Sequence, residues 1–159
     1  MAHPHDALAV LQAEHDEVRR LARAFDRARK EDDRYGKRPI ALAFCTAFER
    51  LATVQHEVFH PAAAAVLEGE DRALLDKVAT VRQGLHELVK RIRATPPDDP
   101  SSDALVLILA EHAGKALRQQ EDRLFGRLRH SGLDLQGTGE RIAARLAELR
   151  TATPDAPAR

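Results

Sequence analysis

Two stretches of this chain repeat the same pattern of apolar and charged residues, and each repeat contains a histidine. Residues 10–21 (VLQAEHDEVRRL) carry His15, and residues 81–92 (VRQGLHELVKRI) carry His86, at an offset of 71 residues (86 minus 15). Imidazole is a common ligand of iron, zinc and copper. A repeated histidine on repeated helices indicates a site that was built by duplication.

Polar residues on apolar helix faces extend this set of candidates. His15, His56 and Glu121 each have apolar neighbours at helical spacing, which predicts that their side chains point inward. Buried carboxylates and imidazoles need partners, and three such groups from three helices satisfy one another best around a cation. Iron and manganese are held in this way inside helical bundles. The sequence predicts a metal site with these ligands: His15, His56, His60, His86 and Glu121.

Several of these residues also have simpler interpretations. His60 follows His56 by four residues, so the pair can chelate one ion, but a supporting or capping role beside Pro61 is an equal alternative. His86 flanks the apolar stripe of its helix, where a hydrogen-bonded core histidine is the alternative to a ligand. His56 and Glu121 can also form a buried ion pair that needs no metal.

A second repeat supports the first. Residues 56–61 (HEVFHP) can be laid over residues 121–126 (EDRLFG) at an offset of 65 residues (121 minus 56). Together the two offsets predict two helical hairpins that are related by a pseudo-two-fold axis through a central site.

The composition limits what such a site could serve. The chain has 159 residues, 43% of them hydrophobic, with 25 basic and 25 acidic side chains and no tryptophan. This balance gives no reason to expect binding to nucleic acid or to a membrane surface. The single cysteine, Cys45, excludes an internal disulfide and is typical of a reducing compartment. No membrane-spanning or signal-peptide pattern is present. The sequence therefore predicts a cytoplasmic protein.

Breaker residues divide the chain into long periodic segments. Turn-forming clusters occur at residues 35–39, 68–71, 95–103 and 130–132. They predict an all-α fold with four long helices near residues 5–33, 38–68, 71–94 and 102–130 and a shorter fifth helix near 139–151. Short connections predict an up-down-up-down four-helix bundle as one domain, residues 1–150, followed by a flexible tail, residues 151–159.

These features resemble the hemerythrin-like, or HHE cation-binding, domain family. The resemblance covers roughly residues 5–150 and is carried by residues 7–21 (ALAVLQAEHDEVRRL), by the His-Pro and Phe-Gly ends of the second and fourth helices, and by His86. It implies a four-helix bundle with a non-haem di-iron centre that binds or senses oxygen or acts in stress responses. In this family the first and third helices each give one histidine, and the second and fourth each give His-x-x-x-Glu.

The chain departs from that pattern at the ligand positions. Aligned on Pro61 and Gly126, the second-helix pair falls on Ala52 and His56, and the fourth-helix pair falls on Leu117 and Glu121. The loss of two histidines and one bridging carboxylate favours mononuclear non-haem iron over a di-iron centre. Small or apolar residues at former ligand positions also make haem an alternative cofactor.

Two functions follow as predictions. The first is a metal-binding protein, with iron as the expected metal, that binds or senses oxygen, peroxide or nitric oxide at a His/Glu site inside the bundle. The alternative is a divergent bundle that binds haem, or has lost its metal and acts as an interaction or regulatory module with a protein partner of unspecified kind. Apart from the candidate ligands, no residue is identifiable as a catalytic acid or base, so enzymatic activity is not predicted either way.

Overall fold

The computed structural model describes residues 5–152, and this part of the chain is all-helical. The elements, in chain order, are α1 (Ala7–Lys30), α2 (Arg34–Val54), η1 (Gln55–Phe59), α3 (His60–Ala64), α4 (Gly69–Ala94), α5 (Ser102–Gln119), η2 (Gln120–Phe125), α6 (Gly126–Arg129) and α7 (Leu135–Ala152). The two η elements are π-helical turns that continue α2 into α3 and α5 into α6. The all-α prediction is therefore confirmed. The predicted tail lies outside the described residues from position 153 on, and residues 151–152 are the last of α7.

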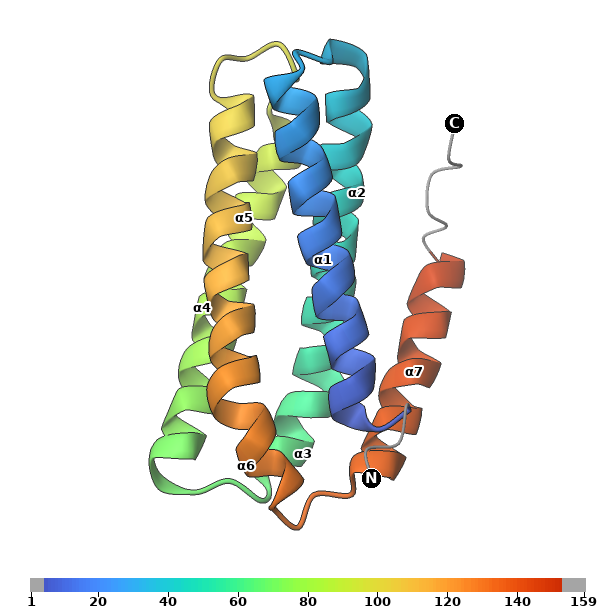
Figure 1. Ribbon diagram of the computed structural model, residues 1–159, viewed down its shortest axis with the longest axis vertical. Helices are drawn as coiled ribbons and strands as arrows, with labels where there is room; N and C mark the ends of the chain where they lie inside the picture. Colours follow the sequence, from blue (N-terminus) through green and yellow to red (C-terminus); the bar gives the residue numbers. More distant parts are fainter. Residues whose placement is uncertain (1–4, 153–159) are drawn as a thin grey trace.

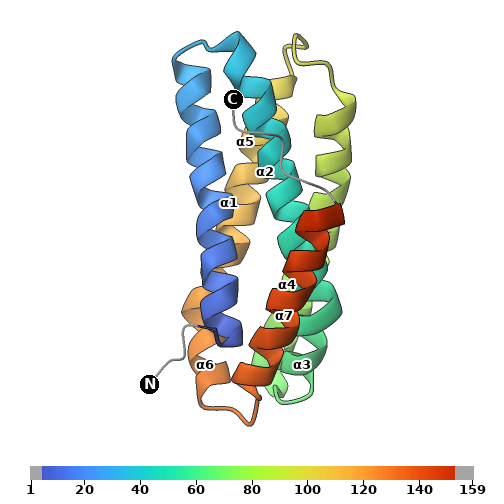
Figure 2. The same cartoon turned by 90° about the vertical axis from the view of Figure 1, so that its right-hand side faces the viewer.

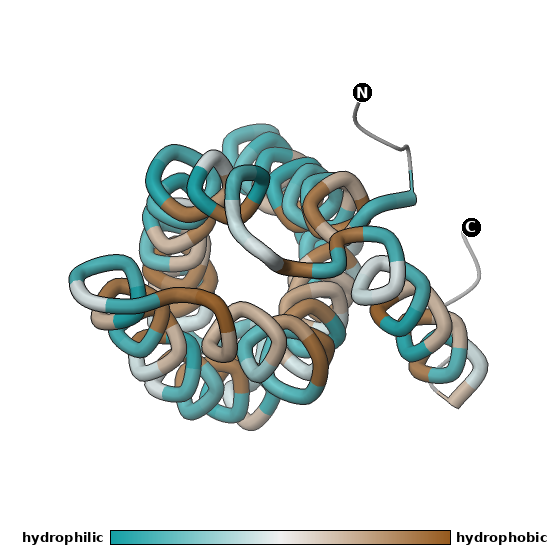
Figure 3. The backbone as a smooth tube through the Cα atoms, turned by 90° about the horizontal axis from the view of Figure 1, so that it is seen from below, coloured by the Kyte–Doolittle hydropathy of each residue, from teal (hydrophilic) through white to brown (hydrophobic). Residues whose placement is uncertain are grey.

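Long helical columns lie side by side along the longest axis of the molecule (Figures 1 and 2). They consist of α1, of α2 with α3, of α4, and of α5 with α6, and they surround a common interior when seen along that axis (Figure 3). The interior is filled by aliphatic and aromatic side chains, which supply the main free energy of folding. The largest of these fully buried side chains include Phe25, Phe44, Phe59, Leu51, Leu109 and Leu124.

The start of α2 differs from the prediction. The helix begins at Arg34, four residues before the predicted start, because the Asp33 carboxylate accepts a hydrogen bond from the backbone N–H of Gly36 at 2.9 Å. The predicted turn at residues 35–39 therefore lies inside the first turns of α2, and Pro39 is part of the helix. Pro39 has no backbone N–H, so the carbonyl of Tyr35 lacks its usual helical hydrogen bond. Tyr35 is 93% exposed, so water can reach this end of the helix.

The last helix, α7, packs on the outside against α1 and α2. Ion pairs hold it there: Arg145 binds Glu57 at 2.7 Å, and Arg150 binds the buried Glu14 at 2.5 Å. At Gly139 the backbone of α7 passes so close to the chain before α1 that an added Cβ would lie 2.2 Å from the carbonyl oxygen of His5. The N-terminal and C-terminal elements are thus joined at one end of the molecule.

Within residues 5–152, no helix combines the length and the apolar character needed to cross a membrane.

Candidate functional site

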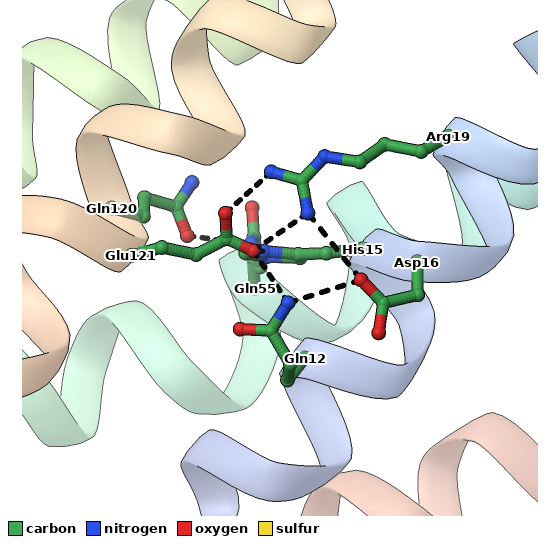
Figure 4. A network of polar contacts seen from close by, with 7 residues as sticks. All are labelled: Gln12, His15, Asp16, Arg19, Gln55, Gln120 and Glu121. Carbon is green, nitrogen blue, oxygen red and sulfur yellow. Dashed lines mark hydrogen bonds and ion pairs between the residues drawn. The ribbon is translucent and has the colours of Figure 1, made fainter.

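A group of polar side chains lies in the interior, between α1, η1, α4 and η2. We call it the interior polar network and define it by its members: His15, Gln55, Arg82, Gln120 and Glu121. The first four are buried, with exposures between 0% and 8%, and Glu121 keeps 16% of its side chain exposed. Figure 4 shows four of the members, which come from α1, η1 and η2, pointing toward one another. Polar groups in a protein core are normally hydrogen-bonded, so the partners of each member are informative.

The hydrogen bonds of this network run in one direction. Arg82 donates from Nη1 to the Oε1 atom of Gln55 at 3.1 Å. Gln55 donates from Nε2 to Oε1 of Gln120 at 2.9 Å, and the same nitrogen lies 3.4 Å from Nε2 of His15. His15 then contacts Oε2 of Glu121 through Nδ1 at 3.0 Å. This pattern assigns the proton of a neutral His15 to Nδ1 and makes Nε2 an acceptor. The chain of donors thus begins at a cation and ends at an anion.

Burial keeps His15 neutral. Removal from water lowers the pKa of His15, and this effect exceeds the opposing effects of the hydrogen bond and charge of Glu121. The ring also stacks on Phe125, with 5.6 Å between ring centroids. The contact between His15 and Glu121 is therefore a hydrogen bond from a neutral imidazole rather than an ion pair at neutral pH.

The charge of Glu121 is matched from the outer side of the network. Arg19 binds both carboxylate oxygens of Glu121, and Gln12 donates to Oε2 at 2.7 Å (Figure 4). Burial alone would raise the pKa of Glu121, but the hydrogen bonds from Arg19, His15 and Gln12 outweigh it and lower the pKa to about 2. Glu121 is therefore ionised at any physiological pH and is fully engaged by side chains.

Gln55 and Gln120 are each the first residue of a π-helical turn. Such turns change the register of the residues that follow, relative to a continuous α-helix, and they are frequent at functional sites. Around η1 the inward position is Gln55, four residues after the buried Leu51, and not the neighbouring His56. The buried residues from position 51 to 63 are Leu51, Val54, Gln55, Phe59 and Ala63. Gln55 and Gln120 are 65 positions apart (120 minus 55) and bond to each other. The predicted offset of 65 residues thus relates Gln55 to Gln120, which are the residues directly before the predicted ligands His56 and Glu121.

The structure distributes the predicted metal ligands over different places. His15 and Glu121 meet in the interior, as expected from their stripes. His56 is exposed, so its predicted inward orientation is wrong, because the buried face of the second column runs from Phe48 through Leu51 to Gln55 at ordinary helical spacing. His86 is exposed on α4. His60 bonds to Asp76 at 3.1 Å at the surface between α3 and α4. Among the described residues, no group of three His, Cys, Asp or Glu side chains lies close enough to hold a metal ion.

Sequence reasoning missed three members of the network. Arg82 lies in the α4 stripe of buried residues, between Val78 and Leu85, although it is a basic residue. Its position three and four residues from buried apolar neighbours was the signal that could have found it. Gln55 and Gln120 could have been found from the 65-residue offset, which matches them as well as it matches their neighbours.

The interior does not fit the iron centre that the resemblance implies. Both ring nitrogens of His15 and both oxygens of Glu121 already face hydrogen-bond donors or acceptors of the chain. The guanidinium of Arg82 stands at the opposite end of the network. Burial lowers its pKa to about 10, which still leaves it charged at neutral pH. A metal ion among these groups would be repelled by Arg82 and would have to displace Arg19 from Glu121.

The histidines that could bind haem beside Ala52 and Leu117 do not converge on the interior. Leu117 packs in the core with 3% of its surface exposed, and His56, His60 and His86 lie outside the interior that holds His15. A groove of about 760 Å³ lies instead on the surface between α1 and α5. It is lined by these residues: Ala22, Arg23, Asp26, Arg27, Lys30, Glu31, Leu107, Ala110 and Glu111. None of the predicted ligands lines it.

No model of a known protein family, no curated protein and no solved structure matches the chain. Its function is therefore inferred from the interior polar network and from the surface of the chain itself.

Proposed function

We propose that this chain is a hemerythrin-like, up-down-up-down four-helix bundle whose interior is held by hydrogen bonds in place of a metal, and that it acts as an interaction or regulatory module. The observation that carries the proposal is the continuous chain of donors from Arg82 through Gln55 and His15 to Glu121. The guanidinium of Arg82, which is charged at neutral pH, lies at one end of this interior. A metal-binding protein would place negatively charged ligands there. The buried Cys45, a free thiol, fits a cytoplasmic location.

Iron binding with oxygen, peroxide or nitric oxide as the small ligand is the second candidate. One observation favours it: an imidazole and a carboxylate from different helical columns lie 3.0 Å apart at His15 and Glu121. Two such donors are fewer than the ligands that a tight mononuclear site uses. This candidate therefore requires Arg19 to release Glu121 and further donors to move in.

Metal analysis of the untagged full-length protein separates the two candidates. The protein is incubated anaerobically with one equivalent of Fe(II), dialysed and analysed for iron, and its thermal unfolding is followed with and without a chelator. We expect less than about 0.1 iron per chain and the same Tm in both conditions, because the folded interior needs no metal. Stoichiometric iron that is lost in His15→Ala, but retained in a His112→Ala control at an exposed position, would overturn the proposal.

The interaction role is tested at the exposed apolar side chains. Tyr35, Val81 and Ile108 are 93%, 38% and 43% exposed, so a partner can reach them. A photo-crosslinking residue placed at each position in cells should give a discrete protein adduct at one or more of them. The same residue at the exposed, charged Lys77 serves as the control. Equal or absent labelling at all four positions would argue against a protein partner.

A further inference from the structure

Arg82 is a buried cation with unused hydrogen-bonding capacity. Its side chain projects from α4 into the interior polar network, and the residue is only 8% exposed. Nη1 donates to Gln55 at 3.1 Å, whereas Nη2 is buried and has no hydrogen-bond partner. A buried N–H without an acceptor costs about 1 to 3 kcal/mol, and more when the donor is charged. The position next to Nη2 therefore requires an acceptor.

The charge of Arg82 is also unmatched within the part of the chain that the structure describes. Burial alone lowers the pKa of Arg82, and no neighbouring carboxylate raises it again. Three buried or half-buried carboxylates, in contrast, are each paired with an arginine: Glu14 with Arg150, Asp6 with Arg129, and Glu121 with Arg19. Buried charges in proteins are normally paired because removing an ion from water is expensive. Arg82 is thus missing both an acceptor and a negative charge.

We propose that the interior polar network binds a small monovalent anion at Nη2 of Arg82. A single guanidinium charge matches a single negative charge, and an anion accepts the hydrogen bond that Nη2 now lacks. Because Nη2 is buried, we expect the ligand to be a halide or a planar oxyanion of a few atoms, such as nitrate or formate. A water molecule would supply an acceptor but no charge, so it is the outcome that the experiment must distinguish.

An anion bound to Arg82 would affect the other contacts of the interior polar network. Arg82 bonds to Gln55, and Gln55 lies between Gln120 and His15, so the position of the guanidinium affects contacts on three helical columns. An anion that fixes Arg82 would stabilise the whole network and with it the folded state. The inference rests on the proposed function in one respect only, that the interior holds no metal, and iron analysis tests that point separately.

The test compares thermal unfolding of the full-length wild-type protein in sodium chloride, sodium nitrate and sodium formate, each mixed with sodium gluconate at constant ionic strength. Gluconate is too large for an enclosed site and serves as the inert anion. We expect a saturable rise in Tm of about 4 °C when a small anion exceeds its dissociation constant about tenfold. A rise with chloride alone identifies a halide site, and a rise with nitrate and formate identifies a planar oxyanion site.

Two arginine variants of α4 locate the effect. Arg82→Met removes the cation and should abolish the rise, whereas Arg91→Met, at an exposed position, should retain it. If Arg82→Met fails to fold, Arg82→Lys keeps a charge with altered geometry and should weaken the anion dependence about tenfold. The proposal is overturned by a Tm that is the same in all four anions, by an anion effect that persists in Arg82→Met, or by an anion dependence that Arg82→Lys does not weaken. An iron-free protein without anion dependence would leave the proposed function intact.

Discussion

Nδ1 of His15 lies 3.0 Å from Oε2 of Glu121. The two residues are 106 positions apart in the sequence and belong to different helical columns. The imidazole is fully buried, while the carboxylate reaches the surface and is bound there by Arg19. A neutral donor on the inside and a guanidinium on the outside share one carboxylate. This arrangement fixes the protonation state of both residues and gives the fold a defined dependence on pH.

The His15 side of the pair predicts a loss of stability in weak acid. Burial lowers the pKa of His15 below its ordinary value of 6.5, so the unfolded chain binds a proton more readily than the folded one. The free energy of unfolding should therefore be highest above about pH 6.5 and should fall as the pH drops from there toward the pKa of the folded state. Protonation of Nε2 would also oppose the donor of Gln55.

Chemical denaturation of wild type and His15→Gln between pH 7.5 and 5 measures this effect. The variant keeps a donor for Glu121 but cannot titrate, so its unfolding free energy should change less over this range. His112→Gln removes an exposed histidine of α5 and should follow the wild-type curve. If the two variants behave alike, the imidazole of His15 does not control stability in this window.

Glu121 predicts a second loss of stability at lower pH. Its pKa is lowered from 4.5 to about 2 in the folded protein, because the hydrogen bonds from Arg19, His15 and Gln12 outweigh the effect of burial. Its contribution is fully present above about pH 4.5 and is lost as the pH falls toward 2. Glu121→Gln should flatten the acid limb of stability between these values, as followed by circular dichroism.

The neighbouring carboxylate provides the matched control for that experiment. Asp122 is the next residue in η2 and is exposed, so Asp122→Asn should leave the acid limb close to wild type. An acid limb that is flattened equally by both substitutions would show that general surface charge, rather than the contact between Arg19 and Glu121, sets the response.

The helices were predictable from sequence because their signals are local. Breakers and apolar periodicity predicted each long column, and the main error at α2 arose because Asp33 caps a helix that contains Pro39. The interior site was predictable only in part. His15 and Glu121 were found because both lie on apolar stripes, but in the second column the stripe was placed one position too late, on Ala52 and His56 in place of Leu51 and Gln55. The spacing from Phe48 through Leu51 to Gln55 is that of an ordinary α-helix, so the polar character of Gln55, and not the helix geometry, concealed its inward position.

Arg82 illustrates a different limit of sequence reasoning. Its neighbours in the stripe of α4 favour an inward position, but a basic residue among exposed charges also fits the solvated flank of a helix. Only the contact with Gln55, which comes from another column 27 positions earlier, decides between the two. Long-range hydrogen bonds of this kind have no local sequence signal.

Gln55 is the member on which most of the network depends. It accepts from Arg82, donates to Gln120 and lies beside His15, so Gln55→Leu would leave several buried polar atoms without partners. We expect the free energy of unfolding to fall by about 3 kcal/mol. Gln83→Leu, at an exposed position of α4, should change it by less than about 0.5 kcal/mol. A Gln55 variant as stable as the control would mean that the network contributes little to the fold.

The approach of α7 to the chain before α1 gives a prediction about how the outer helix is held. At Gly139 an added Cβ would lie 2.2 Å from the carbonyl oxygen of His5 and 2.7 Å from the backbone nitrogen of Ala7, and backbone atoms cannot rotate away as a side chain can. Gly139→Ala should therefore lower the free energy of unfolding by about 1 to 3 kcal/mol and increase proteolysis of α7. Gly126→Ala is the control, since a Cβ there meets no atom within 4 Å and alanine favours the helix by up to about 1 kcal/mol. A Gly139 variant that matches wild type in stability and in protection of α7 would show that this close contact does not hold the helix in place.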